Sequence, residues 1–456
     1  MMQEAVACNK KDNYYLGNVK ADFSQVNAWD NHNPYLYTVY VEVFDENGEL
    51  VEVVPYKVGF RRLEMVNKVM YLNGKRLIIV GVNRHEWNPR TGRCIGMEEM
   101  ESDMKCILRN NINSVRTCHY PDQIPWYYMC DENGIYLMSE TNLESHGSFQ
   151  KLGAIEPSCN VPGSVPQWKE AVIERARANF ETFKNHTSVL FWSLGNESYA
   201  GDDIEAMNVY FKEKNDGRLV HYESSFYNRA YEDTISDMES RMYAKPAEVE
   251  EYLSNNPKKP YILCEFMHDM GNSMGGFKEY WDLIRKYDNL LGGHIWDWKD
   301  QGLSRIDAAG VKNWGYGGDY ERPSDVNSGN FCINGVVAPD CTPKPAMWTC
   351  KYVYQPIEFT AVDLNSFRIT LKNRNFHMST ERYVYTWELK DEMAVLQKGS
   401  LAVPVMAPGE TVEVAVPVKK FAPKSGVTYM LNVYAHESVD LPYVTAGHVN
   451  SSEQFV

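Results

Sequence analysis

The chain has 456 residues, a length typical of two to four domains and sufficient to bury a large core. Its 46 Lys and Arg residues against 61 Asp and Glu residues give a formal net charge of -15, and no basic run or stripe interrupts this acidic balance. The composition therefore argues against nucleic acid as a partner.

Cysteine usage and hydropathy bear on the compartment. The ten cysteines include no C-x-x-C pair, and Cys94, Cys106, Cys118 and Cys130 fall on predicted strands and helices rather than on loops. We expect buried free thiols in a reducing compartment, and hence a cytoplasmic location. No run of about 18 apolar residues occurs, and the first residues lack the pattern of an export signal, so no membrane partner is expected.

The first predicted element is a β-hairpin over residues 35–60. Apolar and polar residues alternate in YLYTVYVEVF and ELVEVVPYKVGF, on either side of an Asp-Glu-Asn-Gly turn at 45–48. Residues 1–34 are too few and too polar to supply the other strands of a sandwich. We therefore expect residues 1–65 to form a partial immunoglobulin-like β-sandwich that is cut short at its N-terminus.

Residues 66–340 have the pattern of repeated βα units, in which short apolar strands alternate with helical segments. One helix, WKEAVIERARANFETFK, places Trp168, Val172 and Phe180 on one face. The segment 145–167 is interpreted as an active-site loop. Eight strands are predicted, at 77–85, 112–119, 135–142, 189–197, 219–225, 235–238, 261–266 and 293–298. This count predicts a central (β/α)8 TIM barrel as the catalytic domain.

Residues 341–456 return to a β pattern. Alternating runs occur at 366–372, 382–390, 412–418 and 427–435, separated by turns, and no helical stretch is expected after Pro345. The pattern predicts a second immunoglobulin-like β-sandwich. The predicted fold class is therefore multidomain, α/β plus all-β, with a TIM barrel flanked by β-sandwiches.

Two glutamates stand out among the polar residues that end the predicted barrel strands, where TIM-barrel enzymes carry out their chemistry. Glu197 and Glu265 each close an apolar β run. Two carboxylates that face one cavity are required for glycoside cleavage, because one protonates the leaving oxygen while the other attacks the anomeric carbon or activates water. Taken singly, each glutamate fits a structural ion pair equally well.

The surrounding motifs extend this hypothesis. WSLGNES (192–198) and ILCEFMHDMGNSMGGF (262–277) resemble the acid/base and nucleophile motifs of glycoside hydrolase family 2, and within it those of the large bacterial lactose-cleaving β-galactosidases. The H-D-M-G-N-S run favours that type over β-glucuronidase and β-mannosidase relatives. The similarity also covers VGFRRLEM (58–65), LNGKRLIIVGVNRHEWNP (72–89), TCHYP (117–121), NLESHG (142–147), GGHIWDWKDQGL (292–303) and FCINGVV (331–337).

The resemblance implies a retaining mechanism. Glu265 would attack to form a galactosyl-enzyme, and Glu197 would be the acid/base, with the carboxyl groups about 5 to 5.5 Å apart. Asn196 would bind the sugar 2-hydroxyl. The other residues implied for the galactose pocket are His85, His119, Tyr243, His268, Trp296 and Asn334. Without the resemblance, each histidine would more often be a satisfied core residue.

The resemblance also implies two cofactors. Mg2+ would be held by Glu144, His146 and Glu197, and Na+ by the Phe331 carbonyl and Asn334 near the sugar 6-hydroxyl. Read without the family, Glu144 and His146 are more simply an ordinary hydrogen-bonded pair on a loop.

The chain departs from the family pattern in extent. Family members add an N-terminal jelly roll, a complete first sandwich and a further C-terminal β-domain, and the jelly roll supplies an aspartate to the galactose and Na+ site. We therefore expect impaired turnover of β-galactosides by this chain alone. The alternative is a catalytically incomplete fragment that acts as a binding or assembly module, and self-association into a homo-oligomer is among the expected partner arrangements.

Two other enzyme classes fit the sequence less well. Residues 271–275 match the G-x-S-x-G motif of serine hydrolases, but Ser273 lies several residues after its strand instead of on a sharp turn directly after it. A metal-dependent amidohydrolase barrel would need an H-x-H pair after the first strand, where this chain has Asn83-Arg84-His85-Glu86.

Overall fold

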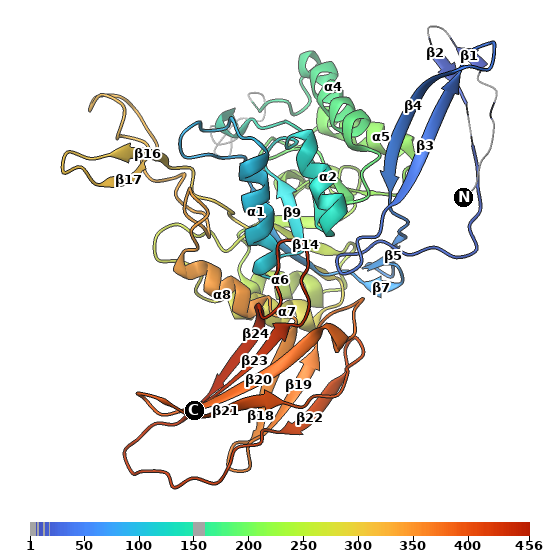
Figure 1. Cartoon of the computed structure of the whole chain (residues 1–456). Coiled ribbons are helices and arrows are strands. Elements are labelled where there is room, and N and C mark those ends of the chain that lie inside the picture. The colour runs from blue at the N-terminus through green and yellow to red at the C-terminus, as the bar shows by residue number, and fades with distance from the viewer. Residues whose placement is uncertain (1–5, 7–8, 12–13, 18, 149–159) are drawn as a thin grey trace.

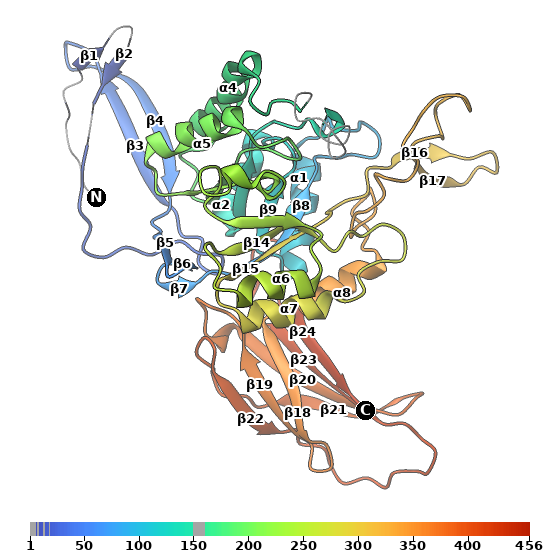
Figure 2. The ribbon, with the colours of Figure 1, turned by 180° about the vertical axis from the view of Figure 1, so that it is seen from behind.

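A computed structural model describes residue 6 and residues 9–11, 14–17, 19–148 and 160–456. Three parts follow one another along the chain: an N-terminal hairpin, a barrel of strands surrounded by helices, and a C-terminal β-sandwich (Figure 1). The barrel lies between the other two, and the sandwich packs below it, next to helices α7 and α8 (Figure 2).

Eight parallel strands form the barrel and confirm the predicted TIM-barrel fold. They pair in the order β12-β11-β10-β9-β8-β15-β14-β13, so the first barrel strand, β8, pairs with the last, β15, as in a barrel. Their bounds are β8 Ile79–Arg84, β9 Ser114–Thr117, β10 Tyr136–Glu140, β11 Val189–Ser193, β12 Leu219–His221, β13 Glu239–Met242, β14 Tyr261–Phe266 and β15 Leu290–Ile295.

The sixth strand was predicted wrongly. It occupies β13 Glu239–Met242 and not 235–238. Residues 235–238 instead form a bend that is hydrogen-bonded to β12. The Asp237 N–H donates to the Val220 carbonyl at 2.9 Å, and the Asp237 carboxylate accepts the Val220 N–H at 2.7 Å. The true strand is polar, and Glu239 is tolerated there because Arg229 and Arg241 pair with it at 2.9 and 2.7 Å.

The eighth strand also starts earlier than the predicted 293–298, at Leu290, and ends at Ile295. Two glycines hide its beginning in the sequence. A Cβ on Gly292 would lie 2.1 Å from the Ile79 carbonyl oxygen, and one on Gly293 would lie 2.5 Å from the Leu263 oxygen. Glycine is therefore required here by close backbone approach, although it weakens the strand pattern.

Among the described residues, the helices that accompany the barrel strands include α1 Met97–Arg109, α2 Ile124–Asn133, α4 Pro166–Phe183, α5 Asp202–Lys214, α6 Pro246–Ser254, α7 Phe277–Lys286 and α8 Pro345–Val353. The helix α4 buries Val172, Ala176 and Phe180 as expected, but Trp168 is 48% exposed and does not belong to its buried face. Of the predicted loop 145–167, residues 149–159 lie outside the described residues, and 166–167 already belong to α4.

The N-terminal hairpin is confirmed as β3 Tyr37–Phe44 paired with β4 Leu50–Val58. The Asp45 carboxylate caps the turn by accepting the Asn47 and Glu49 N–H groups at 2.8 and 2.9 Å, and Gly48 has a φ of 82°. The hairpin projects from the barrel (Figures 1 and 2), and most of its side chains are exposed. Short strands complete the region: β1 Asn9–Lys11, β2 Tyr14–Leu16, β5 Leu63–Val66, β6 Val69–Leu72 and β7 Lys75–Arg76.

The C-terminal sandwich packs two antiparallel sheets face to face. One contains β18 Ile357–Asp363, β19 Arg368–Asn373 and β22 Thr411–Ala415; the other contains β21 Val395–Leu401, β20 Tyr383–Lys390, β23 Met430–Glu437 and β24 Val449–Phe455. Alternate residues of β20, such as Tyr385 and Trp387, point into the core. The expectation of no helix after Pro345 was wrong, because α8 begins there and packs Met347 and Cys350 into the barrel core.

A hairpin of β16 Leu303–Ile306 and β17 Lys312–Gly315 projects from the barrel in both views (Figures 1 and 2). The eight cysteines in the described part of the chain are free thiols, but Cys94 lies exposed in a loop, against expectation. None of the described helices is long and apolar enough to cross a membrane.

Candidate active site

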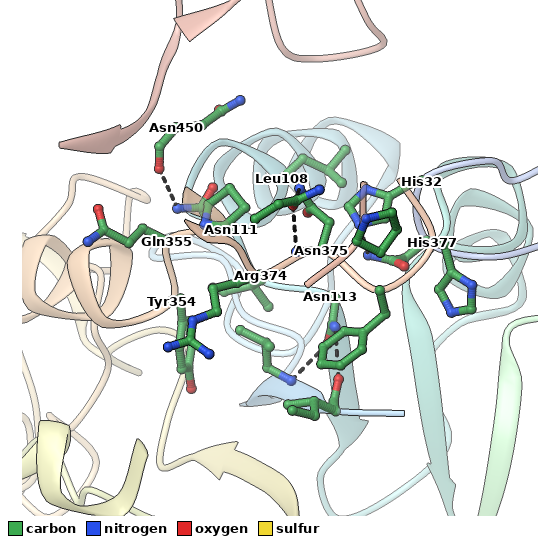
Figure 3. A pocket seen from close by; sticks show the side chains of 18 of the residues that line it. His32, Leu108, Asn111, Asn113, Tyr354, Gln355, Arg374, Asn375, His377 and Asn450 are labelled. Atoms are coloured by element: carbon green, nitrogen blue, oxygen red, sulfur yellow. Dashed lines mark hydrogen bonds between the residues drawn. The ribbon is translucent and has the colours of Figure 1, made fainter. Parts of the chain in front are cut away.

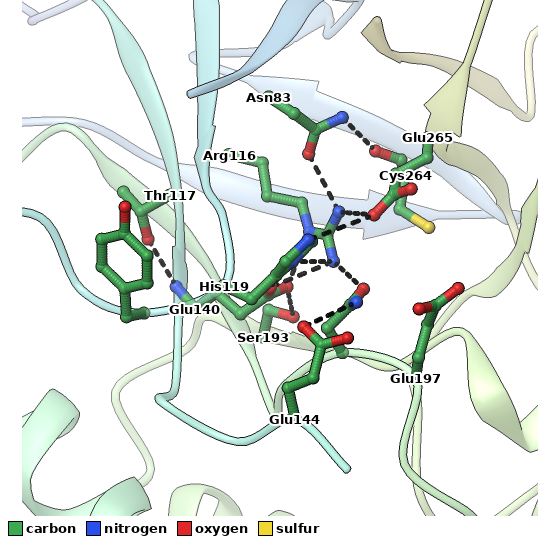
Figure 4. A network of polar contacts seen from close by, with 12 residues as sticks. Asn83, Arg116, Thr117, His119, Glu140, Glu144, Ser193, Glu197, Cys264 and Glu265 are labelled. Atoms are coloured by element: carbon green, nitrogen blue, oxygen red, sulfur yellow. Dashed lines mark hydrogen bonds and ion pairs between the residues drawn. The ribbon is translucent and has the colours of Figure 1, made fainter. Parts of the chain in front are cut away.

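Glu197 and Glu265 lie at the C-terminal end of the barrel. Glu265 is the fifth residue of β14 and is 4% exposed, while Glu197 lies in the loop after β11 with 26% of its side chain exposed. The strands carry both residues to the same edge of the sheet, where a TIM barrel presents its polar side chains. Figure 4 shows the two glutamates beside a buried arginine, Arg116 of β9.

Arg116 is the centre of a buried polar network. Its guanidinium donates to Glu140 at 2.6 Å, to Glu265 at 2.8 Å, to the Asn196 side-chain oxygen at 2.8 Å and to the Asn83 side-chain oxygen at 2.9 Å. The arginine is fully buried. It therefore fixes side chains from four other strands or strand ends in one arrangement.

Glu265 receives two strong donors. Arg116 Nη1 donates to one carboxylate oxygen at 2.8 Å, and the Tyr243 hydroxyl donates to the other at 2.7 Å. The Tyr243 N–H also donates to the Glu265 carbonyl at 2.9 Å. Both Glu265 oxygens act as acceptors, and the carboxylate is held in one orientation.

Glu197 has a different environment. Burial, then the neighbouring carboxylates of Glu265, Glu144 and Glu223, raise its pKa to about 8. Glu223, at the end of β12, accepts the Glu197 N–H at 2.7 Å. A carboxyl group that holds its proton at neutral pH beside one that accepts two hydrogen bonds is the division of roles expected of an acid and a nucleophile.

Asn196 connects the network to Glu144. Its side-chain oxygen accepts from Arg116 at 2.8 Å, and its side-chain nitrogen donates to Glu144 at 3.2 Å. Although Glu144 is exposed as a residue, its carboxyl group lies among protein atoms, which raises its pKa to about 7. The orientation of Asn196 is therefore fixed from both sides.

Three predicted pocket residues form an aromatic wall. The His119 ring stacks on Trp296 with centroids 5.1 Å apart and 7° between the planes, and His85 packs edge-on against both rings. Burial, then the nearby Arg116 charge, lowers the pKa of His119 to about 3, so this imidazole is neutral. A flat wall of this kind suits the apolar face of a sugar ring.

The other predicted pocket residues gather around Tyr243, which donates to the Glu265 oxygen that Arg116 does not contact. The His268 ring packs edge-on against Tyr243 with centroids 5.5 Å apart, and His268 Nε2 lies 3.3 Å from the Asn334 side-chain nitrogen. Asn334 Nδ2 donates to the Phe331 carbonyl at 2.9 Å. All the residues predicted for catalysis and sugar binding thus lie at one end of the barrel.

Both predicted cation sites have suitable donors. The ligand atoms of Glu144, His146 and Glu197 all lie within 4.8 Å of one another, and His146 Nδ1 contacts a Glu197 oxygen. The Asn334 side-chain oxygen is buried and has no hydrogen-bond partner among the described residues. If its amide is turned over, this oxygen lies beside the Phe331 carbonyl, which is the pairing a cation would require.

The sequence analysis assigned no role to Arg116, Glu140 or Glu223. Arg116 donates to both Glu140 oxygens, at 2.6 and 3.0 Å, and burial raises the pKa of Glu223 to about 7. An arginine inside an apolar β run is the only sequence signal for this network. Tyr227, whose pKa is raised by partial burial and then by the Glu197 charge, was also missed.

The serine-hydrolase alternative finds no support in this geometry. Strand β14 ends at Phe266, and Ser273 lies in the following loop, where its hydroxyl donates to the His268 carbonyl. The hydroxyl is therefore engaged by the main chain, and the residue does not occupy a strand-to-helix elbow.

Family models match most of the chain. Residues 63–359, more than half of it, match the model described as "Glycosyl hydrolases family 2, TIM barrel domain". Residues 3–61 match "Glycosyl hydrolases family 2", and residues 369–456 match "Beta-galactosidase, domain 4".

Several curated proteins are similar in sequence. The chain is 59% identical over 332 residues to a β-galactosidase large subunit of Lactobacillus acidophilus, covering 72% of this chain and 52% of that protein. It is 58% identical over 335 residues to a β-galactosidase large subunit of Leuconostoc lactis, covering 73% and 53%. A β-galactosidase of Priestia megaterium is 41% identical over 431 residues, covering 94% and 41%. The chain spans about half the length of the curated relatives it matches.

Solved structures agree in fold. A β-glucuronidase from Ruminococcus gnavus in complex with D-glucuronic acid superposes with a TM-score of 0.53 at 21% identity, covering 71% of this chain and 57% of that one. The ligand-free structure of a β-glucuronidase from the same organism gives a TM-score of 0.54 at 21% identity, covering 71% and 58%. Together with the matched family models, the barrel and its paired glutamates show that the chain belongs to glycoside hydrolase family 2.

Proposed function

We propose that this chain carries the catalytic centre of a retaining β-galactosidase, with Glu265 as nucleophile and Glu197 as acid/base. The observation that carries the proposal is the contrast between the two glutamates. Glu265 accepts hydrogen bonds from Arg116 and Tyr243, whereas burial and adjacent carboxylates raise the pKa of Glu197 to about 8. The proposal of a galactoside as substrate rests on similarity to relatives that are named β-galactosidases.

The proposed reaction has two steps. Glu265 attacks the anomeric carbon while the Glu197 carboxylic acid donates its proton to the leaving oxygen, which gives a galactosyl-enzyme and the released alcohol. Glu197, now a carboxylate, takes a proton from water, whose oxygen attacks the anomeric carbon and releases Glu265. The product keeps the β configuration because the two displacements each invert the centre.

The pocket residues have proposed roles in binding galactose. Trp296, His119 and His85 form the wall on one side, and Tyr243, His268 and Asn334 lie on the other. Asn196 would accept or donate a hydrogen bond at the 2-hydroxyl, where such bonds strengthen in the transition state. Its fixed orientation between Arg116 and Glu144 supports this role.

Two cations are part of the proposal. Glu144, His146 and Glu197 would hold Mg2+, whose charge would favour ionised Glu197, the base of the second step, whereas burial and the adjacent carboxylates favour its protonated form, the acid of the first. The Phe331 carbonyl and the Asn334 side-chain oxygen would hold Na+. A bound cation at either place would supply fixed positive charge beside the sugar.

Metal binding can be tested by thermal unfolding without any substrate. Mg2+ should raise the midpoint temperature of unfolding, because an ion that binds only the folded state stabilises that state. Glu144→Gln should remove this shift, whereas Glu170→Gln, an exposed residue of α4, should retain it. An equal Mg2+ shift in both variants would contradict the assigned ligands.

Azide rescue tests the two glutamate roles. A Glu197→Ala variant should react with an activated aryl β-galactoside to form the glycosyl-enzyme. Azide should then accelerate breakdown of this intermediate and give the β-galactosyl azide. A Glu265→Ala variant should instead give the α-galactosyl azide, because azide then attacks directly. The same azide anomer from both variants would contradict the proposed division of roles.

The rival function is a catalytically incomplete module. It would be supported if a folded wild-type chain neither turned over an aryl galactoside nor formed a covalent adduct. Two relatives are named large subunits, so we include assembly with a second subunit in the proposal; self-association stays a prediction.

A further inference from the structure

A cavity of about 570 Å3 lies between the barrel and the C-terminal sandwich. Its barrel wall comes from the N-terminal ends of β8, β9 and β10, and from α7. Its sandwich wall includes the segment after β19, where Figure 3 shows Arg374 beside Tyr354. The cavity is at the end of the barrel opposite Glu197 and Glu265, so it does not belong to the proposed active site.

Basic side chains outnumber acidic ones around this cavity. Three of the basic groups are neutralised: Arg76 pairs with Asp288 at 3.0 Å, Arg374 with Glu358, and Arg382 with Glu437 at 2.7 Å. The side chains of three further basic residues have no hydrogen bond or ion pair with any described residue; these are Lys75, Arg285 and Lys372. The two acidic residues in the wall, Glu132 and Glu437, are themselves paired.

Two of the unpaired cations gather around one carboxylate. Lys372 lies directly across the β18–β19 ladder from Glu358, and Arg374 pairs with that same glutamate. Arg285 of α7 approaches from the barrel, where burial and then repulsion from Arg374 lower its pKa. Asp282, which also attracts Arg285, is itself paired with Lys278 at 2.6 Å, so Glu358 is left to balance Arg285, Lys372 and Arg374.

The wall next to this cluster is apolar and aromatic. Trp281 and Ile284 lie on α7 beside Arg285, and the Trp281 and Tyr354 rings have centroids 4.8 Å apart. Cavities of roughly 300 to 1,000 Å3 hold small organic ligands, so an inorganic anion would occupy only part of this one. Arg and Lys groups are the usual partners of phosphate oxygens.

We propose that this cavity binds a small phosphate monoester, with the dianionic phosphate among Arg285, Lys372 and Arg374 and the organic part against Trp281 and Tyr354. Such a ligand would supply the negative charge that the cluster lacks and cover the adjacent rings. The proposal does not depend on the galactosidase assignment, because no residue of the cavity belongs to that site.

Titration calorimetry of the full chain at constant ionic strength tests the proposal with phenyl phosphate as probe, and with inorganic phosphate and phenol as comparisons. Phenyl phosphate should bind more tightly than either. Arg285→Gln/Lys372→Gln should weaken its binding at least about tenfold. Lys398→Gln/Lys420→Gln, which removes the same charge from exposed positions outside the cavity, should leave the affinity within about twofold.

The side chains of Arg285 and Lys372 have no hydrogen-bond or ion-pair partner among the described residues, so replacing them leaves no buried acid unpaired. If the double variant is unstable, the two single variants are tested in its place. Equal weakening in both double variants would overturn the proposed site. Binding of phenol or inorganic phosphate as tight as that of phenyl phosphate would overturn the ligand class. Absence of phenyl phosphate binding to the folded wild-type chain would overturn both.

Discussion

Arg116 shows how one side chain links the fold to the proposed chemistry. It is fully buried and contacts Glu140 of β10, Glu265 of β14 and Asn196 after β11. These partners are far apart in the sequence, and only closure of the barrel brings them together. The motifs around Glu197 and Glu265 were sufficient to predict those two glutamates, but no local pattern predicts a network assembled across the barrel.

Replacing Arg116 by lysine should separate positioning from charge. Lysine keeps one positive charge but lacks the planar fork that binds Glu140 and Glu265 together. We expect kcat for an aryl galactoside to fall about 100-fold or more while the chain remains folded. Arg116→Met should in addition lower the free energy of unfolding by about 3 to 5 kcal/mol, because it leaves buried carboxylates without a partner. Wild-type kcat in a folded Arg116→Lys variant would contradict the positioning role.

At the scale of elements, the sequence predicts strands well where they are apolar and without glycine. Strand β14 has the predicted bounds, whereas β13 is polar, and its Glu239 is neutralised by Arg241 of the same strand and by Arg229 from outside it. The start of β15 contains Gly292 and Gly293, which close backbone contacts require. Helix α8 is only nine residues long and lies between the barrel and the C-terminal sandwich. It was not predicted because the β pattern begins soon after it.

The junction between the barrel and the C-terminal sandwich contains a titratable group, His448. His448, just before β24, lies with Nε2 2.8 Å from the Arg109 carbonyl at the end of α1 and 3.1 Å from Lys351 Nζ on α8. Burial, then the Lys351 charge, lowers its pKa to about 4. Arg109 and His436 are the other charged or titratable groups that act on it.

This shift predicts a pH dependence of stability. Between pH 6.5 and about 4 the unfolded chain protonates His448 while the folded chain does not, so stability falls as pH falls through this window. His448→Gln should reduce that loss by about 1 to 2 kcal/mol, allowing for partial solvent contact. Denaturant unfolding at pH 7 and pH 5 measures this change in the free energy of unfolding, with Lys398→Gln, at an exposed position, as the control. The same pH dependence in His448→Gln and wild type would contradict the assignment.

For the whole molecule, the two ends of the barrel have different surroundings. The C-terminal end gathers carboxylates, imidazoles and aromatic rings into the proposed galactoside site, and the N-terminal end packs against the sandwich around a basic cavity (Figures 3 and 4). The order of hairpin, barrel and sandwich was predictable from periodicity. The cavity was not, because its residues come from segments that meet only when the sandwich docks.

Covalent trapping of the nucleophile is the most direct test of the proposed active site. The chain is incubated with an activated 2-deoxy-2-fluoro-β-galactoside in the presence of Mg2+ and Na+, and any adduct is located by peptide mass spectrometry. We expect a 2-fluorogalactosyl ester on Glu265, because slowed hydrolysis lets the glycosyl-enzyme accumulate. An adduct on another carboxylate, or none in a chain shown to be folded, would contradict it.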